Sequence, residues 1–111
     1  MIARSTPWGT IWLGDEFYHL PFDEQQAALA HERGHIAYRH VWKRIAWLVT
    51  LRAFFRQEQF FALCKQQELE ADRFAVMCGH RLGMKYLLLR LKGTEHPAYP
   101  SVRERLENIN G

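Results

Sequence analysis

The apolar positions near the N-terminus follow the pattern of an extended chain. Residues 8–20 are rich in β-branched and aromatic side chains, and Gly14-Asp15 interrupts them as a turn would. We therefore expect one or two short strands here, as a β-hairpin or a single edge strand. Pro21 ends this extended segment.

From residue 23 onward the pattern becomes helical. Asp23 and Gln26 have the spacing of a helix N-cap and its reciprocal partner, so we expect a first helix from there to about His40. Gly34 lies inside it at a cost of about 1 kcal/mol relative to alanine, which indicates a close approach by another element. Further helices are expected over residues 41–63, with a break near 56–59, and over 65–82 and 84–91.

The C-terminal segment begins with a loop and ends with a helix. Residues 96–100 contain two prolines, which exclude a helix there, and Ser101 with Glu104 forms a capping box that opens a last helix. The whole pattern predicts an α+β fold. It is a small, mostly helical single domain over residues 1–111, with a short N-terminal β-hairpin or edge strand.

Composition and charge exclude several classes of protein. The net charge is +3, but basic and acidic residues are interspersed, so we expect no nucleic-acid partner. The longest uncharged apolar stretch, residues 45–51, is far shorter than the ~20 residues of a membrane-spanning helix. Cys64 and Cys78 form no C-x-x-C unit and are expected to be buried free thiols. With no secretory signal at the N-terminus, we expect a soluble, cytoplasmic protein.

The candidate chemistry begins in the first predicted helix, where residues 31–35 form an H-E-x-x-H motif. His31 and His35 lie one turn apart on one helix face and could both bind a zinc ion, at about 2.0–2.1 Å each. Zinc lowers the pKa of a bound water toward about 7, and Glu32 is placed to take its proton as general base. The alternative is a pair of histidines on a polar surface or in helix packing.

A second motif, E-L-E-A-D at residues 68–72, supplies the rest of such a site. Catalytic zinc sites usually have three protein ligands and a water, and Glu68 is the candidate third ligand. Asp72, one turn further, can accept a hydrogen bond from the outer ring nitrogen of a ligating histidine. Glu70 is the rival ligand, but it lies about 200° around the helix from Glu68, so both cannot face the metal. The alternative is a solvated acidic face.

In order and spacing, these motifs resemble the gluzincin metallopeptidases of the HtpX and CAAX prenyl endopeptidase type. The chain length is similar to that of their compact members, called minigluzincins. The resemblance extends over residues 9–14, 23–40, 67–75 and His96-Pro97 with a later arginine. The resemblance implies that His31, His35 and Glu68 bind the zinc, that Glu32 is the general base and that Asp72 orients a histidine. It also implies that Ile11, Trp12 and Leu13 form an edge strand that pairs with an extended peptide substrate.

The resemblance also draws attention to His96, which lies in the predicted loop. It implies either that His96 is a fourth zinc ligand that keeps the enzyme latent, as a zymogen, or that it stabilises the oxyanion. The residues alone allow a loop histidine that packs beside Pro97. The arginine that follows the His-Pro pair in the family corresponds here to Arg103 or Arg105, and both lie further from His96-Pro97 than the family spacing.

Residues 41–63 combine aromatic side chains with Lys43, Arg44, Arg52 and Arg56. We favour a role as core around the active-site helices, with an exposed remainder that mediates self-association. A peripheral contact with a membrane surface is the alternative.

The predicted function is that of a zinc-dependent metalloendopeptidase of the gluzincin type, with one Zn²⁺ per chain and a peptide or unfolded protein as substrate. The alternative is a zinc-bound regulatory or interaction module that does not cleave. Glu32 favours the enzyme, because metal binding does not need it.

Overall fold

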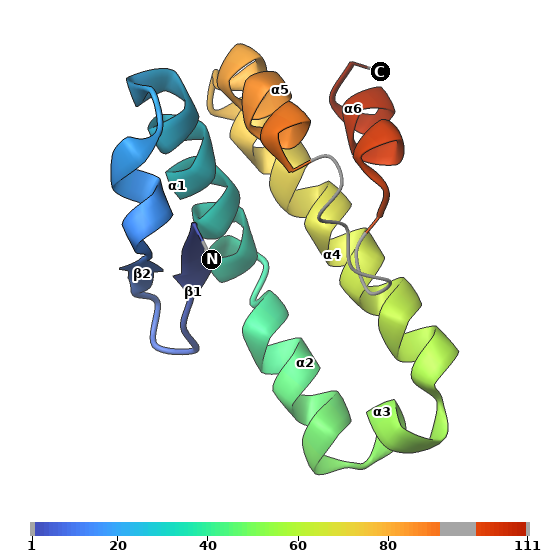
Figure 1. Cartoon of the computed structure of the whole chain (residues 1–111). Coiled ribbons are helices and arrows are strands. Elements are labelled where there is room, and N and C mark those ends of the chain that lie inside the picture. The colour runs from blue at the N-terminus through green and yellow to red at the C-terminus, as the bar shows by residue number, and fades with distance from the viewer. Residues whose placement is uncertain (1, 92–99, 111) are drawn as a thin grey trace.

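The structure is a computed structural model and describes residues 2–91 and 100–110. The N-terminal segment forms a two-stranded antiparallel sheet, in which β1 (Ala3–Ser5) pairs with β2 (Ile11–Leu13) (Figure 1). The predicted hairpin is therefore present. Together with the helices below, it makes up the predicted small, mostly helical fold with a short sheet.

The turn of this hairpin lies earlier than predicted. The chain reverses over residues 6–10, where Gly9 takes a left-handed φ of 84° that glycine adopts without strain. Gly14, predicted to be in the turn, instead precedes η1 (Asp15–His19), a 3-10 helix. Phe17 of η1 is buried in the core, so tertiary packing overrides the strand propensity of this segment.

The helices that the structure describes are α1 (Phe22–Ala37), α2 (His40–Val49), α3 (Arg52–Phe55), α4 (Gln57–Met77), α5 (Arg81–Arg90) and α6 (Val102–Asn110). The first helix ends before the predicted His40, because Arg39 takes a left-handed φ of 56° and redirects the chain into α2. The predicted N-cap at Asp23 is wrong. Pro21 holds the N-cap position, and Asp23 lies in the first turn, where its charge complements the helix dipole.

The predicted boundary between the helices at residues 65–82 and 84–91 is also wrong. The chain leaves α4 at Gly79, which has a φ of 92°, and α5 continues through Gly83. A Cβ at Gly83 would overlap the carbonyl oxygen of Asp23, so this glycine permits helix packing and does not end a helix. The predicted capping box of α6 is confirmed, since the Glu104 N–H donates to Ser101 Oγ at 3.1 Å.

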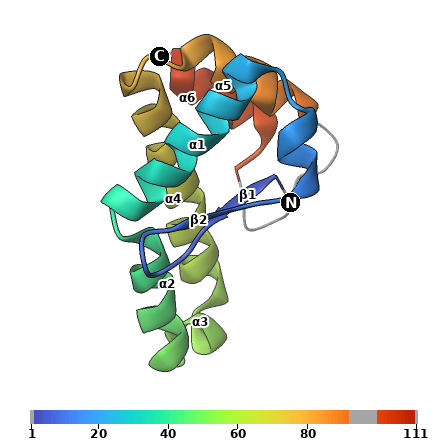
Figure 2. The ribbon, with the colours of Figure 1, turned by 90° about the vertical axis from the view of Figure 1, so that its left-hand side faces the viewer.

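The helix α1 crosses α4 (Figure 2), and the two helices come close together at Gly34. A Cβ at Gly34 would lie 2.9 Å from Phe74 Cβ and 3.0 Å from Ala71 Cα, which confirms the predicted close approach. The core lies around this helix pair, and its buried apolar residues are Phe17, Ala27, Ala28, Ala30, Ala75, Met84, Leu87, Leu88, Val102 and Ile109. Small side chains on α1 therefore bring the two helices with the sequence motifs together.

The segment between the two motif helices is not core, contrary to the favoured prediction for residues 41–63. Among its apolar side chains Ala53 is buried, but most of the large ones are exposed. Figure 1 shows α2 and α3 extending away from the end of the molecule where α5 and α6 pack. Alanines of α1 and apolar residues of α5 and α6 supply the core instead. Cys64 is buried, but Cys78 is exposed, which corrects the prediction of two buried thiols.

Among the described residues, no helix has both the length and the apolar character that crossing a membrane requires.

Replacing Gly34 by alanine tests the helix crossing. We expect Gly34→Ala to lower the free energy of unfolding by about 1–3 kcal/mol, because the added methyl group meets the backbone of α4. This loss would occur although alanine favours a helix by about 1 kcal/mol over glycine. Urea denaturation measures the change, with Arg33→Ala on the exposed side of α1 as control. A Gly34→Ala protein as stable as the native chain would contradict the crossing.

Candidate metal centre

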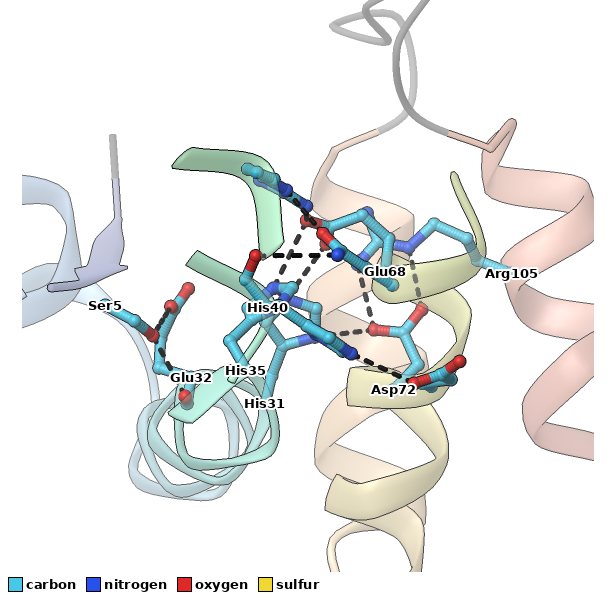
Figure 3. Close-up of polar contacts among 11 residues, drawn as sticks. Ser5, His31, Glu32, His35, His40, Glu68, Asp72 and Arg105 are labelled. Atoms are coloured by element: carbon cyan, nitrogen blue, oxygen red, sulfur yellow. Dashed lines mark hydrogen bonds and ion pairs between the residues drawn. The ribbon is translucent and has the colours of Figure 1, made fainter. Parts of the chain in front are cut away.

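The two motif histidines lie one turn apart on α1, and both side chains are buried between α1 and α4 (Figure 3). Their Nε2 atoms are 3.1 Å apart. Glu68 of α4 faces both rings, with Oε2 3.0 Å from His31 Nε2 and Oε1 3.2 Å from His35 Nε2. The structure therefore brings together two imidazoles and a carboxylate from two helices that lie far apart in the sequence.

These three separations, with one oxygen of Glu68 beside each ring, are close to those between neighbouring ligand atoms of a zinc ion. Zinc bonds of about 2.0–2.1 Å at the tetrahedral angle place neighbouring ligand atoms about 3.3 Å apart. The observed separations among His31, His35 and Glu68 are 3.0–3.2 Å. Glu32 also lies close, because ligand atoms of His31, Glu32 and His35 all fall within 4.8 Å of one another. The donor set of nitrogen and carboxylate oxygen is the one that catalytic zinc sites use.

The outer nitrogens of both rings are held by hydrogen bonds. His31 Nδ1 lies 2.7 Å from Asp72 Oδ1 and donates to it, as predicted for this aspartate. His35 Nδ1 lies 2.8 Å from His40 Nδ1, and His40 Nε2 donates to Glu70 at 2.9 Å. In this network, neutral rings carry their protons on Nδ1 and present both Nε2 lone pairs to each other. With both rings neutral, they and Glu68 form three converging acceptors, and their repulsion is relieved by a cation, which is either a metal ion or, in the metal-free protein, a proton on His31.

This network also explains the positions of two residues that the sequence left open. Glu70 accepts a hydrogen bond from His40 and does not face the Nε2 atoms of His31 and His35. Glu68 is therefore the carboxylate beside both of these atoms. On one continuous helix, a residue five positions past His35 would point away from the ligand face. Because α1 ends at Ala37, His40 instead begins α2 and turns its ring toward His35.

The electrostatics of the centre favour a positive charge beside Glu68. Burial alone would lower the pKa of His31, but the negative charge of Glu68 and the hydrogen bond to Asp72 outweigh it and raise that pKa to about 10. Burial likewise works to raise the pKa of Glu68, but the charge of His31 and hydrogen bonds from both histidines hold it well below its ordinary value. A divalent cation meets the same electrostatic demand as a proton on His31.

Arg105 balances the charge of the buried Asp72 carboxylate. Arg105 of α6 donates to both oxygens of Asp72, at 2.7 and 2.9 Å, and lies 3.6 Å from Glu68. Although burial works against ionisation, this hydrogen bonding keeps the pKa of Asp72 below its ordinary value. Of the two candidate arginines, Arg105 is thus the one at the centre, while Arg103 is exposed and pairs with Glu107.

Arg44 of α2 is a further residue at the centre that sequence analysis did not identify as part of the site. Its guanidinium donates to Glu68 at 3.3 Å and to Gln67 at 2.5 Å. Because Arg44 lies 24 residues from Glu68 and belongs to no motif, its place depends on how α2 folds back along α4.

Glu32 points toward the N-terminal sheet and away from the line between the two rings (Figure 3). The Ser5 hydroxyl on β1 lies 2.5 Å from Glu32 Oε2 and 2.9 Å from the Glu32 carbonyl oxygen. A serine hydroxyl at this distance from a carboxylate is a short, charge-assisted hydrogen bond. The hydroxyl of Ser5 therefore orients the carboxylate of Glu32, the candidate general base. No sequence signal identified this contact between residues 27 positions apart.

A cavity of about 600 Å³ opens beside the centre. The two histidines, Glu32 and Glu68 form part of its wall, and β1 and apolar side chains of α5 form other parts. The described lining residues include Ala3–Ser5 but none from Ile11–Leu13. The strand at the cavity is therefore β1, whereas the resemblance implied β2. The hairpin turns earlier than predicted and so adds a strand before residue 11.

The predicted roles of His96 lie outside the described residues and stay predictions. Comparisons with protein-family models, with curated proteins and with solved structures found no significant match to this chain. The resemblance to gluzincins thus also stays a prediction from the motifs, and functional inference depends on the geometry of the centre.

The Asp72–His31 hydrogen bond gives a prediction about metal affinity. We expect Asp72→Asn to weaken zinc binding by about 10- to 100-fold, because the amide stabilises the oriented imidazole less well than the carboxylate. Competition with a chromophoric chelator measures the affinity. Asp15→Asn on the exposed η1 helix is the control and should bind zinc like the native chain. Equal affinities for all three proteins would contradict a role for Asp72 at a metal centre.

A second prediction concerns the pH dependence of the metal-free protein. The pKa of His31, about 10, lies above its ordinary value of 6.5. Protonated His31 therefore stabilises the fold fully below pH 6.5, and this contribution is lost as the pH rises toward 10. Urea denaturation with a chelator present should show stability falling over this range in the native chain, and a smaller fall in His31→Gln. Parallel profiles for the two proteins would contradict the raised pKa.

Proposed function

We propose that this protein is a zinc-dependent metalloendopeptidase in which His31, His35 and Glu68 hold one zinc ion and Glu32 is the general base. The observation that carries the proposal is the convergence of two imidazole nitrogens and a carboxylate at 3.0–3.2 Å. Two further features support it. The outer ring nitrogens are already engaged, and a second carboxylate, Glu32, lies at the adjoining cavity.

When bound, zinc would supply a Lewis acid that polarises a substrate carbonyl and lowers the pKa of a coordinated water toward about 7. The residues of the chain perform the remaining steps. Glu32 accepts the proton of the attacking water at Oε1, since the Ser5 hydroxyl engages Oε2. The carboxylic acid then returns this proton to the leaving amine nitrogen. Ser5 keeps the carboxylate of Glu32 oriented throughout, and Asp72 and His40 keep the two imidazoles in their tautomers.

The proposed substrate is an extended peptide or an unfolded protein segment. β1 borders the cavity and could pair through its backbone with such a segment, which gives affinity without requiring a particular sequence. Partly exposed apolar side chains such as Ile2 and Leu20 line another part of the cavity and would accept an apolar side chain of the substrate. The proposed activity is therefore hydrolysis of peptide bonds within flexible chains.

Replacing Glu32 by glutamine separates metal binding from catalysis. Zinc content is measured by elemental analysis of protein purified without chelators, and activity by hydrolysis of a fluorescently labelled unfolded protein. We expect one zinc ion in both the native chain and Glu32→Gln. Hydrolysis should fall at least 100-fold in the variant, in line with the loss of a general base. The exposed Glu58→Gln is the matched control and should retain both zinc and activity.

Each other outcome decides against part of the proposal. Native protein without zinc would overturn the metal centre. Zinc in both proteins with hydrolysis by neither would overturn the peptidase and favour the predicted alternative, a zinc-bound module that does not cleave.

A further inference from the structure

The arm formed by α2, α3 and the start of α4 carries an unusual surface at its far end. Five large apolar side chains there are each between 56% and 76% exposed; they are Leu48, Val49, Leu51, Phe54 and Phe55, and we call them the apolar tip. Figures 1 and 2 both show α3 and the end of α2 at the opposite end of the molecule from α5 and α6. Scattered exposed apolar residues are ordinary, but five within eight positions at one end of the molecule indicate a binding surface.

The local backbone holds the apolar tip in a defined shape. The Thr50 hydroxyl donates to the Ala46 carbonyl at 2.7 Å and so closes the last turn of α2. Leu51 then takes a left-handed φ of 59°, which a side chain of this kind rarely adopts, and Phe54 N–H and Phe55 N–H both donate to its carbonyl. The rings of Phe54 and Phe55 contact each other edge to face, with centroids 5.3 Å apart. The apolar side chains therefore project from an ordered turn.

Exposed cations lie within the apolar tip at Arg52 and directly after it at Arg56, and Lys43 is exposed further back on α2. Within the described part of the chain none of the three forms an ion pair. Glu58 is the acidic residue of this region. Arg44 points the other way, toward Glu68 of the metal centre. A patch of aromatic and aliphatic side chains with a basic border complements a surface that is apolar below and anionic above, as the interface of an anionic lipid bilayer is.

The same charges disfavour a second copy of the chain as the occupant. A symmetric dimer through the apolar tip would bring the three cations of one copy toward those of the other, and like charges facing each other oppose association. An anionic lipid surface instead pairs these cations with phosphate groups while the apolar side chains leave water.

We propose that the apolar tip docks this protein on anionic membrane surfaces. Phe54 and Phe55 would enter the boundary between headgroups and acyl chains, with Arg52 and Arg56 at the phosphates. The helix α4 extends from this tip, and Glu68 lies about 16.5 Å along its axis from Gln57, at ~1.5 Å per residue. Docking thus leaves the metal centre in water above the lipid. It requires neither zinc nor peptidase activity, so it does not rest on the proposed function.

Vesicle co-sedimentation of the full chain tests the docking. The vesicles contain phosphatidylcholine alone or phosphatidylcholine with 30 mol% phosphatidylserine. We expect binding to the anionic vesicles and at least fivefold weaker partitioning onto the neutral ones. The double substitution Phe54→Ser with Phe55→Ser should weaken anionic binding at least tenfold, because both rings lose their apolar contact. Arg52→Gln with Arg56→Gln should weaken it about tenfold or more and reduce its dependence on salt.

Matched controls exclude nonspecific effects. Phe22→Ser removes an aromatic side chain that is 70% exposed at the start of α1, and Lys85→Gln removes an exposed cation on α5. Both should bind vesicles like the native chain, and circular dichroism should show equal helix content in all variants because every substituted side chain is exposed. Failure of the native chain to bind anionic vesicles would overturn the proposal, as would equal losses in the control variants. Association of the native chain into dimers that the phenylalanine substitutions dissociate, without vesicle binding, would assign the apolar tip to self-association instead.

Discussion

The candidate metal centre depends on one close helix crossing. At Gly34 the backbone of α1 meets Ala71 and the Cβ of Phe74, and no side chain separates the two helices there. His35 follows that glycine directly and His31 lies one turn before it, so the crossing brings both rings to the face of α4 that carries Glu68. The remaining features of the centre follow from this contact, because it fixes which side chains are buried together.

Burying so many charged groups would be destabilising if any of them lacked a partner. Asp72 is fully buried, and both of its oxygens are engaged by Arg105 and His31. Glu68 lies between the two histidines and Arg44. The charges thus alternate in sign, from the positive Arg105 on α6 to the negative Asp72 and Glu68 on α4 and the positive Arg44 on α2. One consequence is that α6 belongs to the centre although it lies far from both motifs in the sequence, because it positions Arg105, which pairs with Asp72.

Sequence patterns predicted those parts of the structure that depend on near neighbours. The i, i+4 spacings of the two motifs correctly indicate which side chains share a helix face, and the capping box at Ser101 marks the start of α6. Contacts between distant segments were not predictable in this way. Ser5 reaches Glu32 only because the hairpin turns at residues 6–10, and Arg44 reaches Glu68 only because Arg39 redirects the chain out of α1.

The packing of distant segments also explains why residues 41–63 were wrongly expected to be core. A chain of this length was expected to need its aromatic residues inside, but alanines on α1 let the helices approach so closely that little space is left between them. Met84, Leu88 and the apolar side of α6 then complete the core. Most aromatic residues of the arm are therefore exposed, while Arg44 and His40 connect the base of α2 to the candidate metal centre. The arm is thus anchored by polar contacts at one end and presents apolar side chains at the other, an arrangement suited to a surface that other molecules contact.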